Sequence, residues 1–114
     1  MWVSVKENEF NQEVIQSSCP VLVSFWAPWC RLCRIVEPML QQWQSTSAPT
    51  LKLVRVNADE NFYLTRGYDL KSIPAVLLFN EGKLLTHQSL QGDRSHIQSV
   101  LDQVLTQLPL LSGK

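Results

Sequence analysis

Hydrophobic residues recur along this chain in two periods, one typical of strands and one typical of helices. Short apolar or alternating runs predict five strands, at residues 2–5, 21–26, 51–56, 75–79 and 84–90. The turn residues Asn80-Glu81-Gly82-Lys83 separate the last two runs and predict a hairpin. The runs at 21–26 and 75–79 contain no charged residue, so we expect both strands to be buried.

Apolar residues spaced three and four apart predict four helices between and after these strands. The helices are expected at residues 7–16, from Cys30 to Trp43, from a cap at 57–59 to Gly67, and from Gly92-Asp93 to Leu105. Pro38 lies inside the second helix, so a kink is expected about one turn before it. Together these elements predict an α/β fold, in which a mixed sheet of about five strands is flanked by four helices, with helices on both faces.

Composition narrows the class of protein. The chain has 114 residues, 45% of them hydrophobic, which predicts a single packed domain over residues 1–114 with residues 1–5 and 108–114 frayed. Ten basic and ten acidic residues cancel, so the net charge gives no reason to expect nucleic-acid or membrane binding. We see no apolar run long enough for a transmembrane helix and no signal peptide. Three cysteines are too few for a secreted disulfide framework, which favours a reducing compartment.

Cys30 and Cys33 are the residues that carry chemistry. They lie three residues apart at the start of the second helix, where their separation of roughly 5–6 Å suits a disulfide. The free N–H groups of a helix N-terminus favour a thiolate at Cys30, and Cys33 can then attack a mixed disulfide formed there. Cys30 is therefore the expected nucleophile and Cys33 the resolving thiol. A zinc site is not expected, because Cys19 and two distant histidines supply no second pair of ligands.

The chain resembles the thioredoxin family over nearly its whole length. The resemblance is carried by Phe25-Trp26-Ala27-Pro28-Trp29-Cys30, Pro38, Ile73-Pro74, Phe79-Asn80-Glu81-Gly82-Lys83 and Gly92, which occur in the family's order. It implies a cis peptide before Pro74. It also implies that four residues form an apolar groove beside Cys30 for an extended substrate segment: Trp29, Ile73, Pro74 and Gly92.

Two differences from the family pattern affect the chemistry of the thiols. Typical thioredoxins carry Gly-Pro between the cysteines, whereas this chain has Arg31-Leu32. A positive charge beside the Cys30 thiolate stabilises the dithiol, so the pair is expected to be less reducing than a typical thioredoxin. The alternative is that Arg31 is simply solvated and has a negligible effect.

The second difference is Ser24, which stands where thioredoxins usually have a buried aspartate paired with a lysine. The lysine position corresponds to Arg55, and a serine cannot act as a base near neutral pH. Arg55 then either turns to Glu37, Asp59 or solvent, or stays near Cys33 and favours its thiolate. The interpretation we favour slightly is that Arg55 extends outward and Cys33 deprotonates slowly.

The resemblance implies a thiol–disulfide oxidoreductase, an enzyme that needs no metal or organic cofactor beyond its own redox-active disulfide. Its expected partners are disulfide-containing proteins and a thioredoxin reductase or equivalent electron donor. We expect a cytoplasmic monomer active in electron transport and redox homeostasis, or a protein of the plastid stroma if a transit peptide has been removed. The alternatives are a protein-disulfide oxidase or isomerase, and a non-catalytic binding subunit of the same fold.

Overall fold

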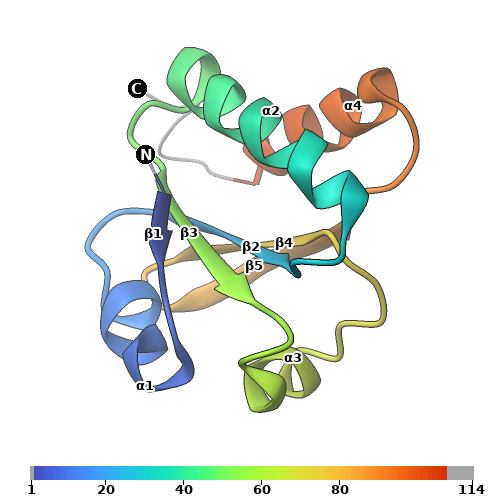
Figure 1. Ribbon diagram of the computed structural model, residues 1–114. Coiled ribbons are helices and arrows are strands. Elements are labelled where there is room, and N and C mark those ends of the chain that lie inside the picture. Colours follow the sequence, from blue (N-terminus) through green and yellow to red (C-terminus); the bar gives the residue numbers. More distant parts are fainter. Residues whose placement is uncertain (1, 108–114) are drawn as a thin grey trace.

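A computed structural model describes residues 2–107, which form a central sheet with helices on both faces (Figure 1). The strands are β1 (Trp2–Ser4), β2 (Val21–Trp26), β3 (Lys52–Asn57), β4 (Ala75–Asn80) and β5 (Lys83–Ser89). The helices are α1 (Glu7–Phe10), continued by the π-helical turn η1 (Asn11–Ile15), α2 (Arg31–Ser47), α3 (Phe62–Gly67) and α4 (Arg94–Leu105). The predicted α/β class, the mixed sheet and the flanking helices are confirmed.

The sheet has the strand order β1-β3-β2-β4-β5. Strands β1, β3 and β2 are parallel, while β4 runs antiparallel to β2 and forms a hairpin with β5. The apolar strand β2 is therefore central. The end of β2 pairs with β3 on one side and with the start of β4 on the other, so that Phe25 lies opposite both Val56 and Ala75. This placement brings the loops before β4 and after β3 to the end of β2, where the cysteines follow.

Two apolar layers lie on opposite faces of the sheet. Alternate residues of β2 and β3 enter different layers: Leu22 and Leu53 pack under α2 and α4, whereas Val23 and Val54 pack against α1, η1 and the end of α3. Figure 1 shows α2 and α4 side by side above the sheet and α1 and α3 below it. Ser24 lies on the α2 side and is 3% exposed, so the residue beneath the cysteine helix is polar but uncharged.

Helix α2 is the longest element and carries the cysteines at its first turn. It contains Pro38, as expected, and its buried side chains Val36, Leu40 and Trp43 recur at the spacing of one helix face. At the start of α4, the Asp93 carboxylate accepts a hydrogen bond from the His96 N–H at 2.9 Å, which confirms the predicted helix start.

Two local predictions were only partly correct. The expected helix over residues 7–16 changes at Asn11 to wider π-type hydrogen bonding, in which the Gln16 N–H donates to the Asn11 carbonyl. Hydrophobic spacing alone does not distinguish the two patterns. The cap expected at residues 57–59 for α3 was wrong, since Asn61 is the N-cap residue and its side chain forms no capping bond.

A carboxylate from another part of the chain caps α3 in its place. Glu7 Oε2 accepts hydrogen bonds from the backbone N–H groups of Tyr63 at 2.7 Å and Leu64 at 3.1 Å. In return, Asn61 Oδ1 accepts the Glu7 N–H at 2.9 Å. The start of α1 and the start of α3 are thus joined by side chains that satisfy each other's free backbone groups.

Candidate redox site

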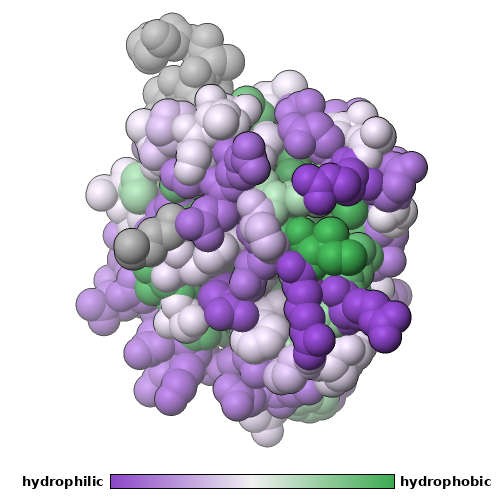
Figure 2. All heavy atoms as spheres, turned by 45° about the horizontal axis from the view of Figure 1, so that its top comes forward, coloured by the Kyte–Doolittle hydropathy of each residue, from purple (hydrophilic) through white to green (hydrophobic). Residues whose placement is uncertain are grey.

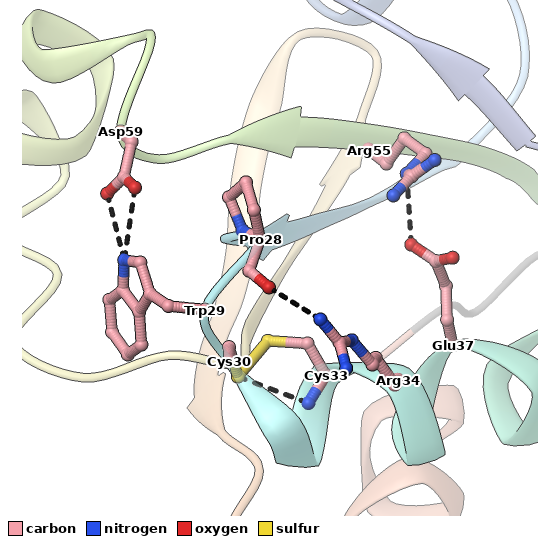
Figure 3. Close-up of a disulfide and its surroundings, with 8 residues drawn as sticks. All are labelled: Pro28, Trp29, Cys30, Cys33, Arg34, Glu37, Arg55 and Asp59. Atoms are coloured by element: carbon pink, nitrogen blue, oxygen red, sulfur yellow. Dashed lines mark hydrogen bonds and ion pairs between the residues drawn. A yellow bond between two sulfur atoms is a disulfide. The ribbon is translucent and has the colours of Figure 1, made fainter.

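The candidate site lies where β2 turns into α2. Cys30 is the N-cap residue of α2 and is joined to Cys33 by a disulfide, with 5.3 Å between the Cα atoms (Figure 3). The Cys30 sulfur accepts a hydrogen bond from the Cys33 N–H at 3.1 Å. In the reduced protein this N–H points at the atom that becomes a thiolate, so the helix start stabilises negative charge on Cys30.

Both cysteines are nearly buried, at 5% exposure each, and pack with Ala27 in a small apolar cluster. Trp29, just before them, is 68% exposed. Its indole N–H donates to both carboxylate oxygens of Asp59 in the loop after β3, with distances of 3.0 and 3.3 Å (Figure 3). The exposed aromatic ring is therefore held in place beside the disulfide.

The loop before β4 approaches the same cluster. The Ile73–Pro74 peptide is cis, which confirms the prediction from the family resemblance, and Ile73 packs against the cysteine cluster. The Pro74 carbonyl accepts the Leu90 N–H at 3.0 Å, which fixes the segment after β5 to this loop. Gly92 follows in that segment with φ of 93°, a conformation that favours glycine.

The residues between the cysteines face different environments. Arg31 begins α2 and is exposed, whereas Leu32 is half-buried and packs against both the cysteine cluster and the layer under α2. Arg34 is also exposed, and its guanidinium donates to the Pro28 carbonyl at 3.0 Å across the turn (Figure 3). Two positive charges thus lie on the first turn of α2, close to Cys30 in sequence.

Arg55 lies beside Ser24, as predicted from the family pattern: the two are register partners in β3 and β2. The prediction that Arg55 extends outward was wrong. Its guanidinium carbon lies 4.1 Å from the centre of the Trp26 ring, and its Nε lies 2.9 Å from Glu37 Oε2. The N–H does not point along this line, so the contact is an ion pair without hydrogen-bond geometry.

A small cavity of about 70 Å³ connects these groups to the resolving cysteine. Its lining comes from the turn after β2, from the first two turns of α2 and from β3, namely Trp26, Ala27, Pro28, Cys33, Arg34, Glu37 and Arg55. One water needs only about 10–15 Å³ of such space, so the cavity has room for water. A larger hollow of about 270 Å³ also has Arg55 in its lining, together with Lys6 and Glu9 among others, and neither cysteine lines it.

Sequence reasoning placed Glu37 and Asp59 among three possible environments of Arg55 and gave neither a role of its own. The structure separates them: Glu37 pairs with Arg55, and Asp59 holds Trp29. The spacing of Glu37, four residues after Cys33 on one helix, was the available signal.

The outer surface above the site is mostly hydrophilic. Figure 2 shows the face that carries α2 and α4, where one compact apolar patch is bordered by strongly hydrophilic side chains. Among residues 2–107, no helix is long and apolar enough to cross a membrane. The same residues contain no group of three or more histidine, cysteine, aspartate or glutamate side chains arranged to hold a metal ion.

Known proteins resemble this chain over most of its length. The family model described as Thioredoxin matches residues 1–103. A thioredoxin 1 from Synechococcus elongatus is 42% identical over 80 residues, covering 70% of this chain and 75% of the relative. A thioredoxin from Porphyra purpurea is 33% identical over 102 residues, covering 90% and 95%, respectively. A chloroplastic M-type thioredoxin from Chlamydomonas reinhardtii is 40% identical over 80 residues, covering 70% and 57%.

Proposed function

This chain belongs to the thioredoxin family and is a thiol–disulfide oxidoreductase, and we propose that Cys30 and Cys33 carry out its reaction in two steps. The Cys30 thiolate attacks a substrate disulfide, forming a mixed disulfide and expelling one substrate thiolate. The Cys33 thiolate then attacks the Cys30 sulfur, closing the Cys30–Cys33 disulfide and expelling the second substrate thiolate. Two electrons pass from the dithiol to the substrate, and both expelled thiolates take up protons.

The observation that carries these roles is the position of Cys30 at the N-cap of α2. Its sulfur receives the Cys33 N–H, so negative charge is stabilised on Cys30 rather than on Cys33. The Cα separation of 5.3 Å lets the second thiol reach the first without movement of the backbone. The order of attack follows from this asymmetry.

Substrate binds, on this proposal, in an extended form along Trp29, Ile73, Pro74 and Gly92. The exposed Trp29 ring and the partly buried Ile73 supply apolar contacts on either side of the disulfide. Backbone groups of the loop before β4 supply hydrogen bonds in the manner of an added strand. Electrons reach the protein from a thioredoxin reductase or an equivalent donor.

The dithiol is less reducing than that of a thioredoxin with Gly-Pro between its cysteines, on this proposal, because Arg31 favours the thiolate form. Leu32 also gives the turn between the cysteines a backbone N–H group, which a proline at this position would lack. The protein works as a single-domain monomer over residues 1–114, needs no bound metal or organic cofactor, and acts in the cytoplasm or, like the chloroplastic relative, in a plastid.

Trapping with Cys33→Ser tests the two-step mechanism. This variant retains the nucleophile and lacks the resolving thiol. It should therefore remain attached to its partner protein through a mixed disulfide that a reductant cleaves. Cys30→Ser is the matched control and should trap nothing. Trapping by Cys30→Ser and not by Cys33→Ser would reverse the two roles. Equilibration with glutathione redox buffers tests the potential: a value as low as that of a Gly-Pro thioredoxin would contradict the proposed effect of Arg31.

A further inference from the structure

We propose that Glu37 accepts the proton of Cys33 during the second step, through water in the cavity that both residues line. The inference rests on the proposed function, since it concerns the attack of Cys33 on the mixed disulfide. Cys33 is 5% exposed, and burial disfavours a thiolate, so the step needs a nearby group to receive the proton. Ser24, directly beneath the cysteine helix on β2, is not a base near neutral pH.

Glu37 and Cys33 line the same cavity. Cys33 and Glu37 are four residues apart on α2, on one face of the helix, and both contribute to the walls of the 70 Å³ cavity. A base can act directly or through one intervening water, and this cavity has room for that water. Figure 3 shows Glu37 rising from α2 on the side that faces β3, with its carboxylate turned toward Arg55.

Arg55 positions the carboxylate. Its guanidinium is stacked on Trp26 at 4.1 Å, so the cation is fixed by the strand layer and holds Glu37 Oε2 at 2.9 Å. The other carboxylate oxygen, Oε1, makes no hydrogen bond or ion pair with any described residue. One oxygen is thus anchored and the other remains available to accept a proton.

No other charged group that lines the cavity can take this role. These groups are Arg34 from α2, Glu37 from α2 and Arg55 from β3. Arginine remains protonated at any physiological pH and cannot accept a proton. Asp59, the other acidic residue near the redox turn, lies outside the lining and binds the Trp29 indole.

The step balances as follows in the reducing direction. The Cys33 thiol gives its proton, through water, to the Glu37 carboxylate and becomes a thiolate. That thiolate attacks the Cys30 sulfur of the mixed disulfide, the new S–S bond forms, and the bond from Cys30 to the substrate breaks with its electron pair on the substrate sulfur. Glu37 then gives its proton either to the expelled thiolate or to solvent, which protonates that thiolate in turn, and the carboxylate is restored.

A two-phase assay separates the proton transfer from the initial attack. Reduced protein is mixed with an equimolar amount of a dithiobis-nitrobenzoate disulfide, whose coloured thiolate is released once by Cys30 and once more when Cys33 resolves the mixed disulfide. Glu37→Gln should leave the first phase within about twofold of the unmodified chain. The second phase should slow by about 100-fold, the order of a general-base contribution.

The pH dependence distinguishes loss of a base from a change in packing. Without the carboxylate, the second phase depends on hydroxide and should rise nearly tenfold per pH unit between about pH 6 and 8. With Glu37 present, the second phase should rise much less steeply over this range. Glu81→Gln, an equal charge change at the exposed hairpin after β4, is the matched control and should alter neither phase.

A rescue variant addresses a purely structural effect of Glu37→Gln. Adding Ser24→Asp to Glu37→Gln places a carboxylate beneath the same helix, next to Arg55. The second phase of this double variant should be at least tenfold faster than that of Glu37→Gln alone. No recovery, or a second phase of Glu37→Gln within about twofold of the unmodified chain, would overturn the inference. A missing first phase in the unmodified chain would instead contradict the proposed function, and the inference with it.

Discussion

Replacing Glu7 tests whether a carboxylate from α1 caps α3. Glu7 Oε2 accepts two backbone N–H groups of the first turn of α3, at 2.7 and 3.1 Å, as the side chain of an N-cap residue normally does. Asn61 does not take that role, because its amide donates to the Asn57 carbonyl and its oxygen accepts the Glu7 N–H. Glu7→Ala therefore leaves two helix N–H groups without their acceptor.

The expected loss follows from these contacts. A capping side chain contributes about 1 kcal/mol, and a negative charge at a helix N-terminus adds about 0.3–1 kcal/mol. Glu7→Ala should lower the free energy of unfolding by about 1–2 kcal/mol, whereas Glu7→Gln, which keeps an oxygen acceptor, should lower it by about 0.3–1 kcal/mol.

Urea unfolding followed by circular dichroism measures this difference. The midpoint should fall with an unchanged slope, because the same surface is exposed on unfolding. Glu60→Ala, at an exposed turn position close to α3, is the control and should stay within about 0.5 kcal/mol of the unmodified chain. Equal midpoints for Glu7→Ala and Glu60→Ala would refute the capping role of Glu7.

Two other predictions concern the redox pair and the alkaline limit of stability. Arg31→Gln should lower the reduction potential, measured in glutathione buffers, by roughly 5–20 mV. This range follows because an exposed charge contributes about 0.2–1 kcal/mol, and about 30 mV corresponds to about 1.4 kcal/mol. Arg66→Gln, at the end of α3, is the control, and equal potentials would show that the charge is screened. Burial raises the pKa of Tyr68 above its ordinary value of 10.0, so the unfolded chain loses this proton first as pH rises. Stability should fall above about pH 10, and Tyr68→Phe should weaken that fall in urea midpoints.

Sequence patterns predicted the elements whose signal is local. The apolar run of β2 and the Asp93 cap of α4 depend on residues within a few positions of one another, and both were found where expected. The cap of α3 could not be predicted in this way. Its acceptor, Glu7, is 56 residues from Tyr63 in sequence, and the pairing of β1 with β3 brings the two together.

The same limit applied at the candidate site. The placement of Ser24 beside Arg55 followed from a family pattern, but the direction of Arg55 did not, because solvent and two carboxylates were all within reach of a long side chain. Stacking on Trp26 decides the direction, since it fixes the guanidinium over one ring and leaves Glu37 as its neighbour. Such a choice depends on the packing of three elements, which periodicity does not encode.

The pairing of β2 with β4 has a consequence for biosynthesis. A ribosome makes the chain from its N-terminus, so the cysteines after β2 are synthesised before Ile73, Pro74 and the strand that carries them into place. Until Phe25 can pair with Ala75, the nascent chain presents both thiols without the loop that later lies against them. A partner that binds along that loop, as proposed above, would therefore find its complete binding surface only after β4 has joined the sheet.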